Sequence, residues 1–256
     1  MISQTELKEF LDEKYYQYNV PEFIESDPIQ IPHMFSKKEN IEISAFLTST
    51  IAWGQRKTII KNAKFLLNLM DNSPFDFVLN VTEKELKIFE NFKHRTFNGE
   101  DCMYFIKSLQ NIYKNHGGLQ NVFYKAYSQN QEIKDSLLYF RQVFFQLNHP
   151  KRTTKHISNI EKKSAAKRLN LFLMWMIRND NRAVHFELWE NFSPSKLYIP
   201  LDVHCGNIGR KLNLLHRKQN DWLAVSELTN KLKEFDDQDP VKYDFALFGI
   251  GVNDDL

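Results

Sequence analysis

Two residues of this 256-residue sequence have the types and positions that suit covalent chemistry, a lysine and an aspartate 35 positions apart. Lys167 precedes a run, residues 169–177, that is apolar except for Asn170, and Asp202 stands just before a second expected helix. A helix that is apolar on all sides belongs in a core, so we expect Lys167 at the edge of a region of low polarity. Burial there disfavours the ammonium ion. The neutral amine of a lysine is a nucleophile that forms Schiff bases.

The aspartate has a position that suits a partner for this amine. A carboxylate at a helix N-terminus is favoured by the backbone N–H groups and by the helix dipole. We therefore expect a capping carboxylate to face the amine. Residues 202–205, DVHC, form the tightest cluster of metal-ligand types in the sequence. No partner cluster has the spacing of a metal site, so we expect a helix cap there and no metal.

The elements that must position these residues are helices. Apolar residues recur at helical spacing, and no segment alternates at period two between hairpin turns, so we predict an all-α fold without a sheet. The helices are expected at residues 5–18, 40–53, 59–70, 101–113, 119–127, 131–147, 164–177, 203–210, 222–235 and 240–248. The length allows one large domain or two intimately joined ones.

Charge and cysteine content limit the function classes. The sequence has 34 basic and 32 acidic residues, so any phosphate-binding face must come from local clusters. Two such clusters exist, at residues 56–64 and 151–168. Cys102 and Cys205 form no CxxC pair, which indicates a reducing compartment. No apolar run is long enough to span a membrane. We expect a cytoplasmic monomer that does not contact a membrane.

Three motifs resemble the helix-hairpin-helix DNA glycosylase superfamily. Residues 167–173, KRLNLFL, are similar to its lysine-led helix, in which an asparagine follows the lysine by three positions. Residues 200–204, PLDVH, are similar to its second signature, an aspartate and a histidine that open the next helix. Residues 46–55, FLTSTIAWGQ, resemble its early helix, which ends in a glutamine. The spacing from Lys167 to Asp202 is similar to that of the archaeal 8-oxoguanine glycosylase branch.

This resemblance implies one compact helical unit of two interleaved lobes, about 40–150 and 1–39 plus 151–256, with a cleft between them that residues 40–55, 164–177 and 200–210 line. It implies base excision with AP lyase activity on duplex DNA, where the damaged base is an oxidised purine or another lesion. It implies that Lys167 and Asp202 are catalytic and that no cofactor takes part, because two cysteines cannot hold the iron-sulfur cluster of some relatives. The target base must leave the stack, and Gln55 is the candidate that fills the gap. The other residues implied to contact DNA are Arg56, Lys163, Ser164, Arg168, Asn170 and His204. The candidates for the base pocket are Trp53, Tyr243, Asp244 and Phe248.

The sequence departs from the superfamily just before the lysine. The glycosylase hairpin has a glycine-x-glycine turn whose backbone amides hold a phosphate, whereas residues 160–164 read IEKKS. We expect lysine side chains of this segment, Lys163 among them, and a helix N-terminus at Ser164 to take over this contact. The chain as a whole, including residues 239–251, DPVKYDFALFGIG, also resembles an uncharacterised bacterial protein family with no assigned activity.

Two other functions fit the same residues. A non-catalytic helical protein could bind DNA or RNA through the basic clusters, and its binding would depend on salt without a covalent intermediate. A helical protein that binds a partner protein would have no affinity for nucleic acid at low salt.

Overall fold

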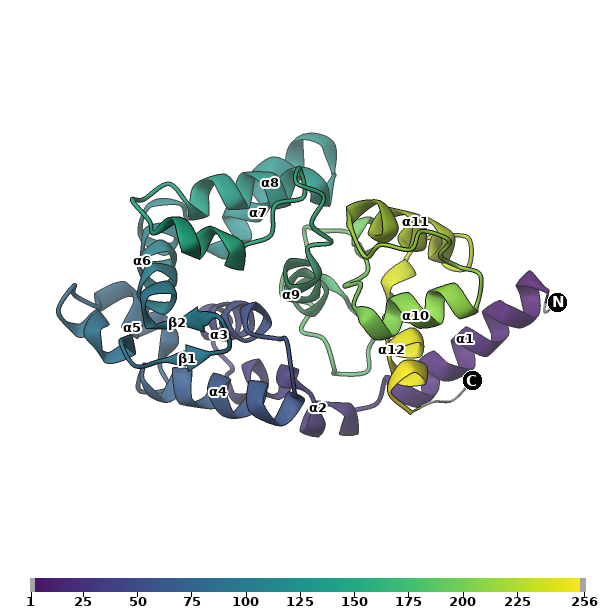
Figure 1. The fold of residues 1–256 in the computed structure, drawn as a ribbon, viewed down its shortest axis with the longest axis horizontal. Helices are drawn as coiled ribbons and strands as arrows, with labels where there is room; N and C mark the ends of the chain where they lie inside the picture. The colour runs from purple at the N-terminus through teal and green to yellow at the C-terminus, as the bar shows by residue number, and fades with distance from the viewer. Residues whose placement is uncertain (1–2, 254–256) are drawn as a thin grey trace. The chain divides into compact units, whose positions relative to one another are not determined.

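The protein is all-α in the computed structural model, which describes residues 3–253; 64% of the residues are helical and 2% lie in strands (Figure 1). The chain forms two compact units. The central unit is residues 26–158, and the terminal unit combines residues 3–25 with residues 159–253. The boundaries therefore follow residues 25 and 158, where the sequence suggested 39 and 150. Within residues 3–253, no helix is both long and apolar enough to cross a membrane.

The central unit is a helical cluster around a core of phenylalanines. Phe46 and Phe105 stack with ring centroids 6.0 Å apart, and Phe123 and Phe140 stack at 4.4 Å. Phe144 meets the edge of Phe105 at 4.7 Å. These rings come from α3 (Lys38–Thr50), α6 (Gly99–Asn115), α7 (Leu119–Asn130) and α8 (Ile133–Phe144), and α7 and α8 lie side by side (Figure 1). The other α-helices of this unit are α4 (Arg56–Asn68) and α5 (Pro74–Asn80); α2 (Glu22–Ser26) ends at its border.

Short 3-10 helices and one hairpin join these elements. The 3-10 helices are η1 (Pro28–Gln30), η2 (Pro32–Met34), η3 (Glu85–Phe89) and η4 (Lys151–His156). The prediction of no sheet is wrong at one place, because β1 (Lys93–His94) pairs antiparallel with β2 (Phe97–Asn98). Each strand has two residues, too few to show a period-two pattern in the sequence. Arg95 takes the left-handed conformation, at φ +53°, in the turn between them.

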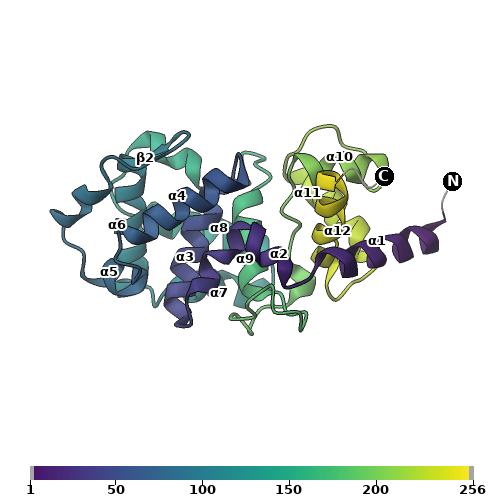
Figure 2. The ribbon, with the colours of Figure 1, turned by 90° about the horizontal axis from the view of Figure 1, so that it is seen from below.

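The terminal unit joins the first helix of the chain to the last ones. Its helices are α1 (Gln4–Tyr18), α9 (Lys167–Ile177), η5 (Pro194–Lys196), α10 (Val203–Lys211), α11 (Trp222–Lys233), η6 (Pro240–Lys242) and α12 (Tyr243–Asn253). α12 packs against both α1 and α10 (Figure 2). The sequence suggested that the last helix ends before Gly249, but α12 continues through it. A Cβ atom at Gly249 would lie 2.2 Å from the ring of Tyr18, so the glycine permits the close approach of α1.

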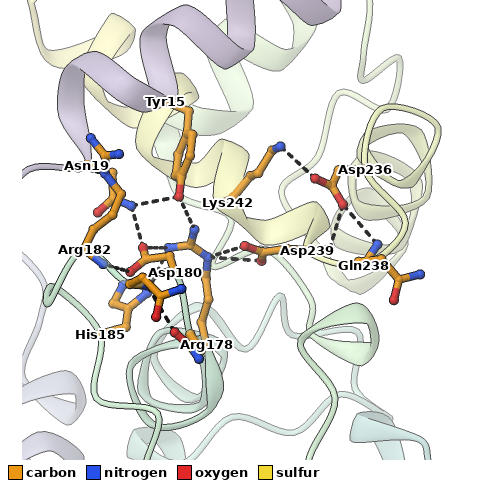
Figure 3. A network of polar contacts seen from close by, with 12 residues as sticks. Tyr15, Asn19, Arg178, Asp180, Arg182, His185, Asp236, Gln238, Asp239 and Lys242 are labelled. Atoms are coloured by element: carbon orange, nitrogen blue, oxygen red, sulfur yellow. Dashed lines mark hydrogen bonds and ion pairs between the residues drawn. The ribbon is translucent and has the colours of Figure 1, made fainter.

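A buried arginine ties three segments of the terminal unit together (Figure 3). Arg178, which follows α9, is fully buried and donates through Nε to Asp239 at 2.8 and 3.0 Å. Its Nη1 donates to Asp180 at 2.7 Å and to His185 Nδ1 at 3.2 Å, and its Nη2 donates to Tyr15 at 2.9 Å. Burial alone would lower the pKa of Arg178, but the facing carboxylates raise it. The charge is therefore retained in the interior.

Candidate active site

Lys167 is the first residue of α9, and the turn before it is held by polar contacts. Ser164 pairs with Asp221 in an isolated antiparallel bridge, and the Trp222 amide donates to the Lys163 carbonyl at 3.1 Å. Lys163 and Ala166 take positive φ values, +64° and +50°. The expectation of a helix N-terminus at Ser164 is therefore wrong, because the backbone is committed to this bridge and turn until residue 166.

Asp202 is the N-cap of α10, as the sequence predicted. Its backbone is extended, at φ −112°, and its Oδ1 accepts a hydrogen bond from the Cys205 amide at 2.9 Å. Asn220 Nδ2 donates to the Asp202 carbonyl at 3.1 Å. The carboxylate thus satisfies one of the N-H groups that a helix leaves unpaired at its start. Its orientation is fixed by backbone atoms, so the second oxygen is available for another partner.

That second partner is Lys167. The distance from Lys167 Nζ to Asp202 Oδ2 is 3.3 Å, so a hydrogen-bonded ion pair joins the first turn of α9 to the cap of α10. The lysine side chain is 35% exposed and the aspartate side chain 12%. Lys167 thus lies at the edge of the interior, with its side chain partly exposed to solvent. An amine that contacts a carboxylate at this distance can transfer a proton to it and then act as a nucleophile.

A cysteine links Asp202 to a second carboxylate. The Cys205 thiol donates to Asp244 Oδ1 at 3.3 Å, while its backbone amide donates to Asp202. Burial raises the pKa of the Cys205 thiol well above its ordinary value, and the charges of Asp244 and Asp202 raise it further. Cys205 therefore remains a protonated donor. Sequence reasoning did not assign Cys205 to the site. Its position three residues after the N-cap could have indicated it, because the amide there bonds to the capping side chain.

Of the other residues proposed from α10 and α12, His204 and Phe248 contact each other, whereas Tyr243 is buried in the core. His204 Nδ1 lies 3.0 Å from the Gly251 carbonyl, and the ring meets the edge of Phe248 at 5.9 Å. Tyr243, in contrast, is fully buried, and its hydroxyl donates to Asp12 at 3.0 Å. Burial raises the pKa of Tyr243, and the charge of Asp12 raises it further. Its ring belongs to the core beside α1.

Two further residues proposed from α9 lie just after the lysine. Burial lowers the pKa of Arg168 to about 10, which still leaves the guanidinium charged at neutral pH. Asn170 is 1% exposed, and its Nδ2 donates to the Ala165 carbonyl at 3.3 Å. This bond helps to hold the turn in front of Lys167. Within residues 3–253, Asn170 Oδ1 has no hydrogen-bond donor.

The remaining proposed residues belong to the central unit. Trp53 is half-buried, with its ring 5.0 Å from His94 in an edge contact and 6.2 Å from His156 in a stacked one. Gln55 is the exposed N-cap of α4 and makes no side-chain capping bond. Arg56 lies 3.9 Å from Asp27.

Metal chemistry was not expected from the sequence. In the part of the chain that the structure describes, no three His, Cys, Asp or Glu side chains come together as a metal-binding group.

The fold and the paired residues define an all-α protein with a lysine and a capping aspartate in contact between two helix N-termini. The chain belongs to the family described as "Protein of unknown function (DUF2400)", whose profile matches residues 27–253. This match includes the candidate site and agrees with the uncharacterised family suggested by the sequence. No curated protein and no solved structure matches the chain.

Proposed function

We propose that the protein is a DNA glycosylase with AP lyase activity, of the helix-hairpin-helix type, that acts on a damaged base through a Schiff base on Lys167. The observation that supports this proposal is the 3.3 Å contact between Lys167 Nζ and Asp202 Oδ2. These two residues are the ones that the motif resemblance makes catalytic, and they are far apart in the chain.

The chemistry assigns a separate task to each group. Asp202 takes a proton from the Lys167 ammonium and passes it to solvent, and the neutral amine attacks the sugar C1′ while the base leaves with the electrons of its glycosidic bond and takes a proton from water. The amine nitrogen then loses a proton, and opening of the C1′–O4′ bond, with protonation of O4′, gives the Schiff base. On an existing abasic site the amine adds to the aldehyde, and loss of water gives the same Schiff base. Removal of a C2′ proton then breaks the C3′–O bond and releases the 3′ phosphate. The Asp202 carboxylate also stabilises positive charge on the sugar.

Borohydride trapping tests the proposal, because it reduces a Schiff base to a stable amine. The substrates are duplexes with one abasic site or one 8-oxoguanine. We expect a covalent adduct with the wild type and none with Lys167→Ala. Lys211→Ala, which removes an exposed lysine at the end of α10, is the matched control and should keep the adduct.

Two results would overturn the proposal that the protein is an enzyme acting through Lys167. One is an adduct that survives in Lys167→Ala, which would put the nucleophile elsewhere. The other is the absence of any adduct with the wild type on either duplex.

A further inference from the structure

The helix α4 presents lysines on one exposed face. Lys57, Lys61 and Lys64 follow one another at spacings of four and three residues, which places them on the same side of a helix. All three are exposed. The opposite side of the helix is apolar and packs into the central unit through Ile59, Ala63, Leu66 and Leu67. No acidic residue occurs between residues 43 and 70, so nothing on this helix offsets the charge.

The β1–β2 hairpin adds two more cations beside this face. Segment 92–95 lies alongside α4, because His94 Nδ1 is 2.9 Å from Asn62 Nδ2 and the ring of Phe92 stacks on that of Phe65 with centroids 6.2 Å apart. At the start of the helix, a Cβ atom on Gly54 would lie 3.2 Å from Arg95 Nη1. Lys93 and Arg95 are both exposed. We call the exposed side chains of this set the α4 basic face: Lys57, Lys61, Lys64, Lys93 and Arg95.

The cations of this face have no carboxylate partner in the part of the chain that the structure describes. Among residues 3–253, none of the five makes an ion pair, whereas Arg56 at the start of the same helix faces Asp27. Like charges so close together repel one another, and a polyanion relieves this repulsion. With a rise of about 1.5 Å per residue, Lys57 and Lys64 lie about 10 Å apart along the axis. That length corresponds to about three nucleotide steps of one strand of duplex DNA.

We propose that the α4 basic face binds the sugar-phosphate backbone of duplex DNA, as a contact surface separate from Lys167. The choice of DNA rests on the proposed function, whereas the charge of the face does not. Lysine ammonium groups contact phosphates as point charges and do not read bases, so this surface holds DNA without regard to sequence.

The test is the salt dependence of binding, measured by fluorescence anisotropy with a labelled 20-base-pair duplex between about 50 and 200 mM salt. The variant is the triple change Lys57→Gln, Lys61→Gln and Lys64→Gln in the full chain. A matched triple at exposed lysines elsewhere in the central unit has the same change in net charge: Lys87→Gln, Lys114→Gln and Lys134→Gln.

Each phosphate contact contributes about 0.9 to the slope of log affinity against log salt. We therefore expect the first triple to reduce that slope by about 2.7, with the greatest loss of affinity at the lowest salt, and the control triple to leave it nearly unchanged. Equal effects of the two triples would overturn the proposal, as would a wild type that does not bind the duplex at 50 mM salt. A slope that depends on the first triple with RNA alone would overturn the assignment to DNA.

Borohydride trapping separates this proposal from the enzyme. If the salt slope depends on the first triple but the protein forms no adduct, the α4 basic face binds DNA and the proposed glycosylase activity is wrong. If the adduct depends on Lys167 but the first triple does not change the salt slope, the glycosylase proposal is supported and the proposal that the α4 basic face binds DNA is wrong.

Discussion

Asp202 is predicted to have two tasks that two substitutions can separate. One oxygen caps α10 through the Cys205 amide at 2.9 Å, and the other contacts Lys167 at 3.3 Å. Asp202→Asn keeps an oxygen for the cap but removes the charge, whereas Asp202→Ala removes both. Loss of an N-cap acceptor costs about 1 kcal/mol, and asparagine caps about as well as aspartate. The ion pair adds no more than about 0.5 kcal/mol, since the lysine side chain is 35% exposed and water screens it.

We therefore expect Asp202→Ala to lower the free energy of unfolding by about 1.5 kcal/mol and Asp202→Asn by about 0.5 kcal/mol. Urea denaturation measures both values. The rate of adduct formation should not follow this order of stability. Both variants lack the carboxylate, so we expect both to form the borohydride-trapped adduct at least about 100-fold more slowly than the wild type. Equal destabilisation by the two substitutions would refute the cap, and wild-type trapping by Asp202→Asn would refute the need for the charge.

Three further predictions concern stability. Arg178→Met should lower the free energy of unfolding by about 3–5 kcal/mol, because the carboxylates of Asp180 and Asp239 lose the buried arginine that pairs with both; a loss under about 1 kcal/mol in urea would contradict this. Burial alone would raise the pKa of Asp101, but its hydrogen bonds, chiefly from His156, lower it from 3.8 to about 2. A lowered folded-state pKa stabilises the fold above pH 3.8, and this contribution, about 2 kcal/mol, should disappear as the pH falls to about 2. Asp101→Asn should lack that part of the pH dependence, and an unchanged dependence would be evidence against it. Gly249→Ala should cost about 1–3 kcal/mol through its clash with the Tyr18 ring, and the cost should fall when Tyr18 is also replaced by alanine.

The sequence predicted helices best where apolar spacing and capping residues agree. The start of α7 at Leu119 and the end of α9 at Ile177 are where the pattern put them. No helix was expected directly after residues 59–70, but Pro74 is the first residue of α5, a position that proline favours. Proline and glycine mark both ends and beginnings, so local sequence alone could not decide between them.

The candidate site was predictable in its individual residues and not in its connections. A resemblance in short motifs identified Lys167 and Asp202. Capping rules left Asn220 and Asp221 as alternatives for the N-cap of α11, and the structure has Asp221 there. The bridge from Ser164 to Asp221 and the contact from Cys205 to Asp244 join residues 57 and 39 positions apart. Helical periodicity carries no information about such pairs, because each helix shows only which of its own faces is buried.

Each unit contains one buried cysteine, whose thiol can report local opening of that unit through its rate of chemical labelling. Cys102 lies in α6 of the central unit and Cys205 in α10 of the terminal unit, and both are fully buried. Burial raises the pKa of both thiols, so neither reacts with an alkylating reagent while its surroundings stay closed. The labelling rate of each sulfur therefore reports how often its own helix opens. One experiment on the unmodified chain can thus compare the opening free energies of the two units.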